Sequence, residues 1–135
     1  MSARVLVVDD LLPNVKLLEA KLTSEYFEVL TASDGPAALE MIQEHPPDIV
    51  LLDIMMPGMD GFQVCERVRE LKLRSAVILM SAYDAEQDNA IKASETGADA
   101  YLSKPLKKGE LLFVVNFVMR VAHLNDAVFE KNKQL

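Results

Sequence analysis

Three carboxylates, a hydroxyl and a lysine stand where short apolar runs of the sequence end. Asp9 and Asp10 end the first run, Asp53 ends the third, Ser81 ends the fourth and Lys104 follows the fifth. Apolar runs that alternate with helical stretches are typical of a parallel sheet covered on both faces, which binds ligands at the carboxyl ends of its strands. We therefore expect these five side chains to meet at one edge of a sheet.

The three carboxylates predict a metal site. Two unit charges about 4 Å apart repel by about 4 kcal/mol at an effective dielectric constant near 20. A divalent cation would offset that repulsion, and oxygen ligands favour a hard ion such as Mg²⁺, with Mn²⁺ as the alternative. Lys104 suits an anion bound beside the ion. Because no serine or cysteine stands beside a base, Asp53 is the expected nucleophile of a phosphoryl-transfer site.

The periodicity of the chain predicts the elements that position these residues. The expected strands are Arg4–Val8, Phe27–Thr31, Asp48–Asp53, Ala76–Ser81 and Ala100–Ser103. A helix should follow each strand: one opened by Pro13, one capped by Asp34 that stops before Pro46, one through Val64 and Val68, one from about Asp84 to Gly97, and a long last helix. This pattern predicts an α/β fold, a doubly wound (βα)5 three-layer sandwich of the flavodoxin-like kind with strand order 2-1-3-4-5.

Composition narrows the class of protein. The 135 residues are 50% hydrophobic and 26% charged, which is typical of a globular domain. The net charge of −7 and the lack of a Lys/Arg cluster argue against direct binding to nucleic acid or to an anionic membrane. Nothing resembles a signal peptide or a membrane span, so we expect a cytoplasmic protein. Cys65 is the single cysteine and is expected to be a buried, inert thiol.

Four segments, in order and at the right spacing, resemble the receiver domain of two-component response regulators. They are Val5–Asp10, Leu51–Gly61, Ser81-Ala82 and Gly97–Pro105, and the resemblance extends over roughly residues 3–120. It implies that Asp53 accepts a phosphoryl group from a phosphohistidine of a sensor histidine kinase or a phosphotransfer protein. Such a domain is not an enzyme in the usual sense, because it catalyses only its own phosphorylation and dephosphorylation.

The resemblance also assigns roles to the residues around Asp53. Asp10 and Asp53 would bind Mg²⁺ directly, Asp9 would bind it through water, and the backbone carbonyl of Met55 would complete the protein ligands. Ser81 and Ala82 would contact the phosphate, and Lys104 would bind one of its oxygens. The Lys104–Pro105 peptide would be cis, and Tyr101 would move from an exposed to a buried position on phosphorylation.

The last helix carries more apolar residues than one core face needs. Leu111, Val115, Val118 and Ala122 recur at helical spacing and can face the sheet. A second series, predicted to form a homodimer interface, comprises Phe113, Val114, Phe117, Val121 and Leu124. The alternative is a single core-facing stripe that is wide by chance. The predicted receiver domain spans residues 1–122, and residues 123–135 would extend the last helix as a linker to an output domain.

Other interpretations of the sequence remain open. The first fifty residues resemble the N-terminal receiver of PleD-type diguanylate cyclase regulators. A dimerisation module that works without phosphorylation is one alternative function. An aspartyl-phosphate phosphatase of the haloacid-dehalogenase type is another, although such enzymes need a second Asp where this chain has Met55. We interpret Asp34 and Asp84 as helix caps, and His45 and His123 as solvated residues without a chemical role.

Overall fold

The computed structural model describes residues 3–82, 87–107 and 109–133, with side chains described within 3–82, 89–107 and 109–122. The described residues form β1 (Arg4–Val8), α1 (Leu12–Thr23), β2 (Glu28–Ala32), α2 (Gly35–Glu44), β3 (Ile49–Asp53), α3 (Gly61–Glu70), β4 (Ala76–Ser81), α4 (Gln87–Glu95), β5 (Ala100–Ser103) and α5 (Glu110–Lys133). The strand pairings are all parallel, in the order β2-β1-β3-β4-β5. The predicted flavodoxin-like (βα)5 fold and its strand order are therefore confirmed.

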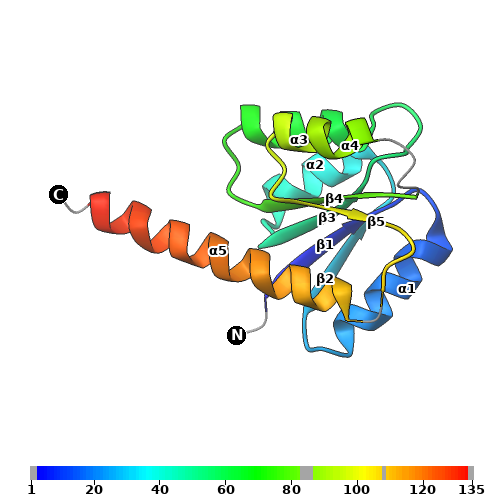
Figure 1. Ribbon diagram of the computed structural model, residues 1–135, viewed down its shortest axis with the longest axis horizontal. Helices are drawn as coiled ribbons and strands as arrows, with labels where there is room; N and C mark the ends of the chain where they lie inside the picture. Colours follow the sequence, from blue (N-terminus) through cyan, green and yellow to red (C-terminus); the bar gives the residue numbers. More distant parts are fainter. Residues whose placement is uncertain (1–2, 83–86, 108, 134–135) are drawn as a thin grey trace.

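Helices cover both faces of the sheet, with α2, α3 and α4 on one face and α1 and α5 on the other (Figure 1). Successive residues of a strand point to opposite faces, so Leu6 and Val8 join the core beneath α2–α4, whereas Val5 and Val7 join the core against α1 and α5. All residues of β3 and β4 are buried. Burial on both faces explains why these strands are apolar almost throughout instead of alternating with polar residues.

Three strand boundaries differ from the prediction: β2 ends at Ala32 instead of Thr31, and the starts of β2 and β3 each lie one residue later than expected. Hydrogen bonds explain the two starts. Phe27 was expected to begin β2, but its N–H donates to the Leu22 carbonyl and closes the end of α1, with Tyr26 at a positive φ of 68°. Asp48 was expected to begin β3. It instead bonds to Arg4, its N–H donating to the Arg4 carbonyl and its carboxylate accepting from the Arg4 N–H.

The last helix continues well beyond the sheet (Figure 1). It runs without a break from Glu110 to Lys133. The expected start of the preceding helix near Asp84 lies outside the described residues. Among the helices described, none is both long enough and apolar enough to cross a membrane.

Candidate functional site

Three carboxylates meet at the carboxyl ends of β1 and β3. Asp9, Asp10 and Asp53 each offer an oxygen, and these oxygens lie within 4.8 Å of one another. Asp9 and Asp53 are buried and Asp10 is exposed. The two strands are parallel neighbours in which Val8 pairs with Leu52, so the residues that follow are held side by side. The acidic cluster predicted from the sequence is therefore present.

Helix capping does not account for the acidic pair that follows β1. The N-cap of α1 is Leu11, whose side chain makes no capping hydrogen bond. The Asp9 Oδ1 atom accepts from the Leu11 N–H at 2.9 Å, which fixes the carboxylate and leaves Oδ2 directed elsewhere. Asp34, in contrast, accepts from the Ala37 N–H at 2.7 Å and caps α2, as predicted.

Lys104 is brought to the acidic cluster from the end of β5. Its backbone N–H donates to the Ser81 carbonyl at 2.7 Å, and its Lys104–Pro105 peptide is cis as predicted. The Lys104 Nζ atom lies 3.2 Å from Asp9 Oδ2 and forms an ion pair with it. Lys104 is therefore paired with the buried carboxylate of Asp9 in this structure.

Asp53 carries a perturbed carboxyl group. Burial raises its pKa from 3.8 to about 6, against the lowering effect of the Lys104 ammonium, and the charges of Asp9 and Asp10 add to the rise. The Met55 N–H donates to Asp53 Oδ1 at 3.2 Å and lowers the pKa slightly. A cation would reverse this perturbation, because it would replace lost hydration and offset the neighbouring charges. Three oxygen donors, one of them exposed to solvent, form an acidic pocket that fits a hard divalent cation.

The predicted switch residues border the same edge of the sheet. Ser81 is buried at the end of β4, and its Oγ atom accepts from the Asn89 Nδ2 at 3.5 Å. Ala82 follows and is exposed. Tyr101 was expected to start from an exposed position, but it is half-buried and packs against the core beneath α2–α4. Its hydroxyl is buried and has no hydrogen-bond partner among the described residues.

Two residues that contribute to the site were missed from the sequence. A Cβ atom on Gly61 would lie 2.5 Å from the Asp53 carbonyl oxygen and 2.8 Å from the Ile54 Cα, so only glycine fits beneath the nucleophile. An Asp-Gly pair suggests no more than a turn, so the sequence did not show this contact. Asn89 was also missed, because a polar residue near a helix start is an ordinary surface feature.

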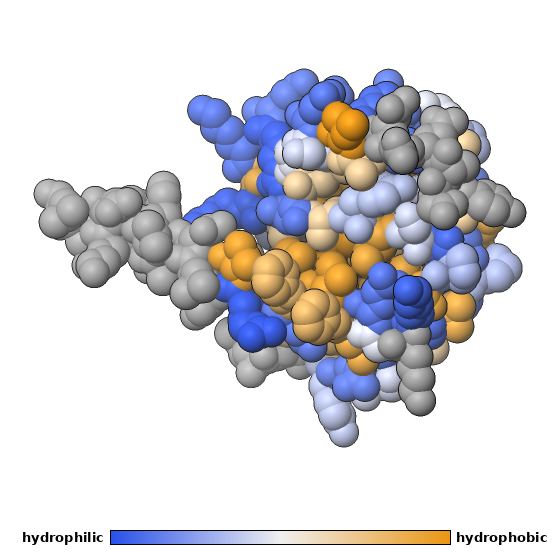
Figure 2. Space-filling model, in the orientation of Figure 1, coloured by the Kyte–Doolittle hydropathy of each residue, from blue (hydrophilic) through white to orange (hydrophobic). Residues whose placement is uncertain are grey.

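The predicted apolar surface on α5 is present in part. Phe113, Phe117 and Val121 are 67%, 53% and 40% exposed. The two phenylalanine rings stack with centroids 6.5 Å apart. Ile91 of α4 is also exposed, and Figure 2 shows an apolar area over α5 that continues toward α4.

Val114 differs from the other members of this predicted interface. It is half-buried and packs against the core shared with α1. It therefore belongs with the core face of α5 more than with the exposed series. The side chain of Leu124 lies outside the described residues.

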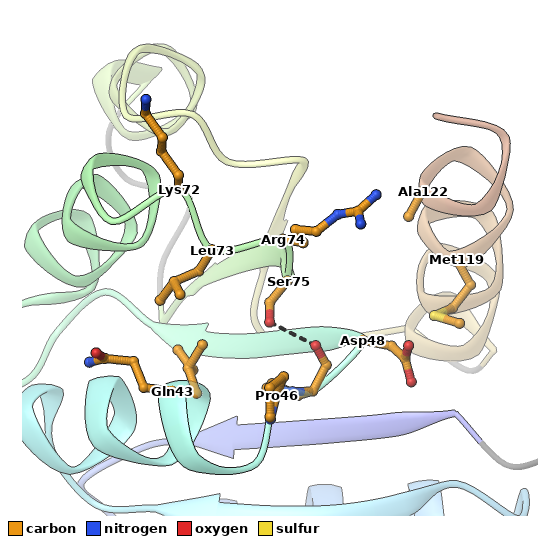
Figure 3. A pocket seen from close by; sticks show the side chains of 11 residues that line it. Gln43, Pro46, Asp48, Lys72, Leu73, Arg74, Ser75, Met119 and Ala122 are labelled. Carbon is orange, nitrogen blue, oxygen red and sulfur yellow. Dashed lines mark hydrogen bonds between the residues drawn. The ribbon is translucent and has the colours of Figure 1, made fainter. Parts of the chain in front are cut away.

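A hollow of about 680 Å³ lies at the amino-terminal ends of β3 and β4, opposite the strand ends that carry the acidic cluster. Figure 3 shows the side chains that line it. The hollow is lined by the end of α2, by the segments just before β3 and β4, and by Met119 and Ala122 of α5. Across it, the Ser75 hydroxyl donates to the Pro47 carbonyl at 2.7 Å. The predicted site residues do not line this hollow, so it is not part of the site.

Comparisons with known proteins agree with this arrangement. The family model of the response regulator receiver domain matches residues 5–116. Over 108 residues, 78% of its length, the chain is 54% identical to the response regulator PleD of Caulobacter vibrioides and covers 24% of that relative. The chain thus spans about a quarter of the length of this relative.

Solved structures of similar proteins have the same fold. The signal receiver domain of a putative Luxo repressor protein from Vibrio parahaemolyticus is 26% identical, with a TM-score of 0.87 over 95% of this chain and 98% of that one. NtrX from Brucella abortus is 28% identical, with a TM-score of 0.88 over 98% of this chain and 30% of that one. The family match over residues 5–116 includes the acidic cluster.

Proposed function

Since this chain belongs to the response regulator receiver domain family, we propose that it acts in two-component signalling by accepting a phosphoryl group on Asp53. The observation that carries the proposal is the cluster of Asp9, Asp10 and Asp53 with Lys104 beside it. The donor would be a phosphohistidine of a sensor histidine kinase or a phosphotransfer protein. The P–N bond breaks with its electron pair leaving on the imidazole nitrogen, and an Asp53 oxygen forms the new P–O bond.

The chain's own residues prepare Asp53 for this reaction. The Met55 N–H orients one carboxylate oxygen, and close packing of Gly61 against the Asp53 carbonyl fixes the backbone beneath it. We propose Asp10, Asp53 and the Met55 carbonyl as direct ligands of Mg²⁺, or of Mn²⁺, with Asp9 acting through water. When bound, the cation supplies charge neutralisation for the nucleophile and the phosphoryl oxygens, and keeps Asp53 ionised.

Lys104 and Ser81 would hold the phosphoryl group after transfer. Lys104 is within 3.2 Å of Asp9, so its flexible side chain has only to turn within the pocket to reach a phosphate oxygen. Ser81 can donate its hydroxyl proton, and Ala82 its backbone N–H, to the other oxygens. These contacts form only when Asp53 is phosphorylated. They therefore shift a two-state conformational equilibrium toward the conformation in which Ser81 and Lys104 reach the phosphoryl group.

The output would be a change in self-association or in the contacts of a further domain. Phe113, Phe117 and Val121 expose apolar surface at one face of α5, and a homodimer would bury it. The helical residues 123–133 extend beyond the receiver domain and would connect it to an output domain.

The proposal is tested by phosphorylation with a small-molecule donor. With Mg²⁺ and acetyl phosphate, intact-mass spectrometry should show a gain of one phosphoryl group, and a chelator should prevent it. Asp53→Asn should show no gain, whereas the exposed-helix control Glu40→Gln should behave as the unaltered chain does. A phosphoryl gain that persists in Asp53→Asn would place the acceptor elsewhere.

The exposed aromatic pair on α5 supports a second candidate, a dimerisation module that works without phosphorylation. Sedimentation with Mg²⁺, with and without beryllofluoride as a phosphoryl mimic, separates the two candidates. A shift from monomer to dimer on adding beryllofluoride supports the phosphorylation switch. A dimer that is unchanged by beryllofluoride and dissociates in Phe117→Glu supports the constitutive module.

A further inference from the structure

Asn89 of α4 contacts the hydroxyl group at the end of β4. Its Nδ2 atom lies 3.5 Å from the Ser81 Oγ atom, and Ser81 is only 4% exposed. Ser81 follows Met80, which is the register partner of Asp53 in the neighbouring strand. The contact therefore joins α4 to the strand position beside the proposed phosphoacceptor.

We propose that Asn89 is a positioning residue that couples the occupancy of Asp53 to α4, an inference that rests on the proposed function. In the free protein, Asn89 holds the Ser81 hydroxyl on the side of α4. A phosphoryl group on Asp53 draws the same hydroxyl toward its own oxygens. The contact with Asn89 is then lost, and α4 loses a tether to the sheet.

The contact between Asn89 and Ser81 matters because few of the described side chains of α4 are buried. Among the described side chains of α4, residues 89–95, Ala93 alone is buried. Lys92 lies over the Phe62 ring, 4.7 Å from its centroid, and is itself exposed. A helix held by so few buried contacts opens at a lower free energy than the core elements. Loss of one polar contact can therefore change how α4 is held while leaving the sheet intact.

Tyr101 is a weaker candidate for this coupling role in this chain. Its ring already packs against the core beneath α2–α4, and its hydroxyl is buried without a partner among the described residues. An inward movement of Tyr101 is therefore largely complete before any phosphoryl group binds. The Asn89–Ser81 contact, in contrast, is made in the free protein and competes directly with the phosphate.

The first measurement is the affinity for beryllofluoride in the presence of Mg²⁺, by titration calorimetry. Asn89→Ala removes a contact made in the free state only, so it should tighten binding by about two- to fourfold, the lower part of the range for one hydrogen bond. Alanine is the best helix former, so the substitution does not weaken α4 through propensity. Ser94→Ala, at an exposed position of the same helix, should leave the affinity unchanged.

A double-mutant cycle shows whether Asn89 acts through Ser81. In a Ser81→Ala background, Asn89→Ala should no longer change the affinity, because the contact is already absent. Hydrogen exchange gives a second readout. Beryllofluoride should accelerate amide exchange in residues 87–95 of the unaltered chain, and Asn89→Ala should show faster exchange there without the ligand.

An affinity that Asn89→Ala leaves unchanged, or changes equally in both backgrounds, overturns the inference while the phosphoacceptor role stands. Failure of the unaltered chain to bind beryllofluoride, or binding that survives in Asp53→Asn, overturns the proposed function and this inference together.

Discussion

Replacement of Asp53 by asparagine should stabilise the protein in the absence of metal. The substitution keeps the shape of the side chain and removes a charge that burial disfavours. The pKa of Asp53 is raised from 3.8 to about 6 in the folded state. A rise in pKa of this size corresponds to at most about 3 kcal/mol in the free energy of unfolding.

The sign of this effect fixes its dependence on pH. Between pH 3.8 and about 6 the folded protein holds the Asp53 proton more tightly than the unfolded chain does. The free energy of unfolding therefore falls as the pH rises through this window. Above about pH 6 the full cost of burying the ionised Asp53 carboxylate is present. The Asn variant has no such group, so its advantage should be near zero below pH 4 and greatest at pH 7.

Urea unfolding of both proteins in a chelator, from pH 4 to pH 8, measures the difference in free energy of unfolding. Glu40→Gln, at an exposed position on α2, is the matched control and should show little difference at any pH. Saturating Mg²⁺ should reduce the advantage of Asp53→Asn, because a ligand of the folded state stabilises the unaltered chain. An Asn variant that is no more stable at pH 7, or equally more stable at pH 4 and pH 7, would refute the reasoning.

Three further predictions concern the framework of the fold. Gly61→Ala should destabilise the fold by about 1–3 kcal/mol through its clash with the Asp53 carbonyl, and thermal unfolding without a loss would contradict this close approach. Tyr26→Gly should raise the free energy of unfolding by about 0.5–1 kcal/mol, because Tyr26 is 86% exposed and its positive φ strains any residue other than glycine. A glycine variant that is less stable in urea would show that this backbone strain is absent. Arg69→Met should lower the free energy of unfolding by about 2 kcal/mol, because the Arg69 guanidinium donates hydrogen bonds to two backbone carbonyls and to the Asp99 carboxylate. An unchanged urea midpoint would show that these hydrogen bonds do not stabilise the fold.

The sequence predicted the fold because apolar runs and helix signals agreed along the chain. Asp34 caps α2 as its spacing from Gly35-Pro36 suggested, and Gly97 occupies the left-handed position that ends α4. The start of β2 was predicted one residue too early. The hydrogen bond from the Phe27 N–H to the Leu22 carbonyl closes the end of α1 and sets that boundary. No residue type in the sequence predicts such a bond.

The candidate site was predictable where residues stand at strand ends, because sheet geometry alone brings them together. This covers Asp9, Asp10, Asp53 and Lys104. The pairing of Lys104 with Asp9, the inward position of Tyr101 and the contact of Asn89 depend on side-chain conformations. Spacing in the sequence does not determine those conformations, so these features emerged only from the structure.

The ion pair between Lys104 and Asp9 makes the lysine an internal counter-ion of the acidic cluster. A cation that binds the carboxylates competes with Lys104 for the charge of Asp9 and so releases the ammonium for an anion. Metal and phosphoryl mimic should therefore bind cooperatively. Thermodynamic reciprocity then requires that beryllofluoride raise the affinity for Mg²⁺ by the same factor by which Mg²⁺ raises the affinity for beryllofluoride.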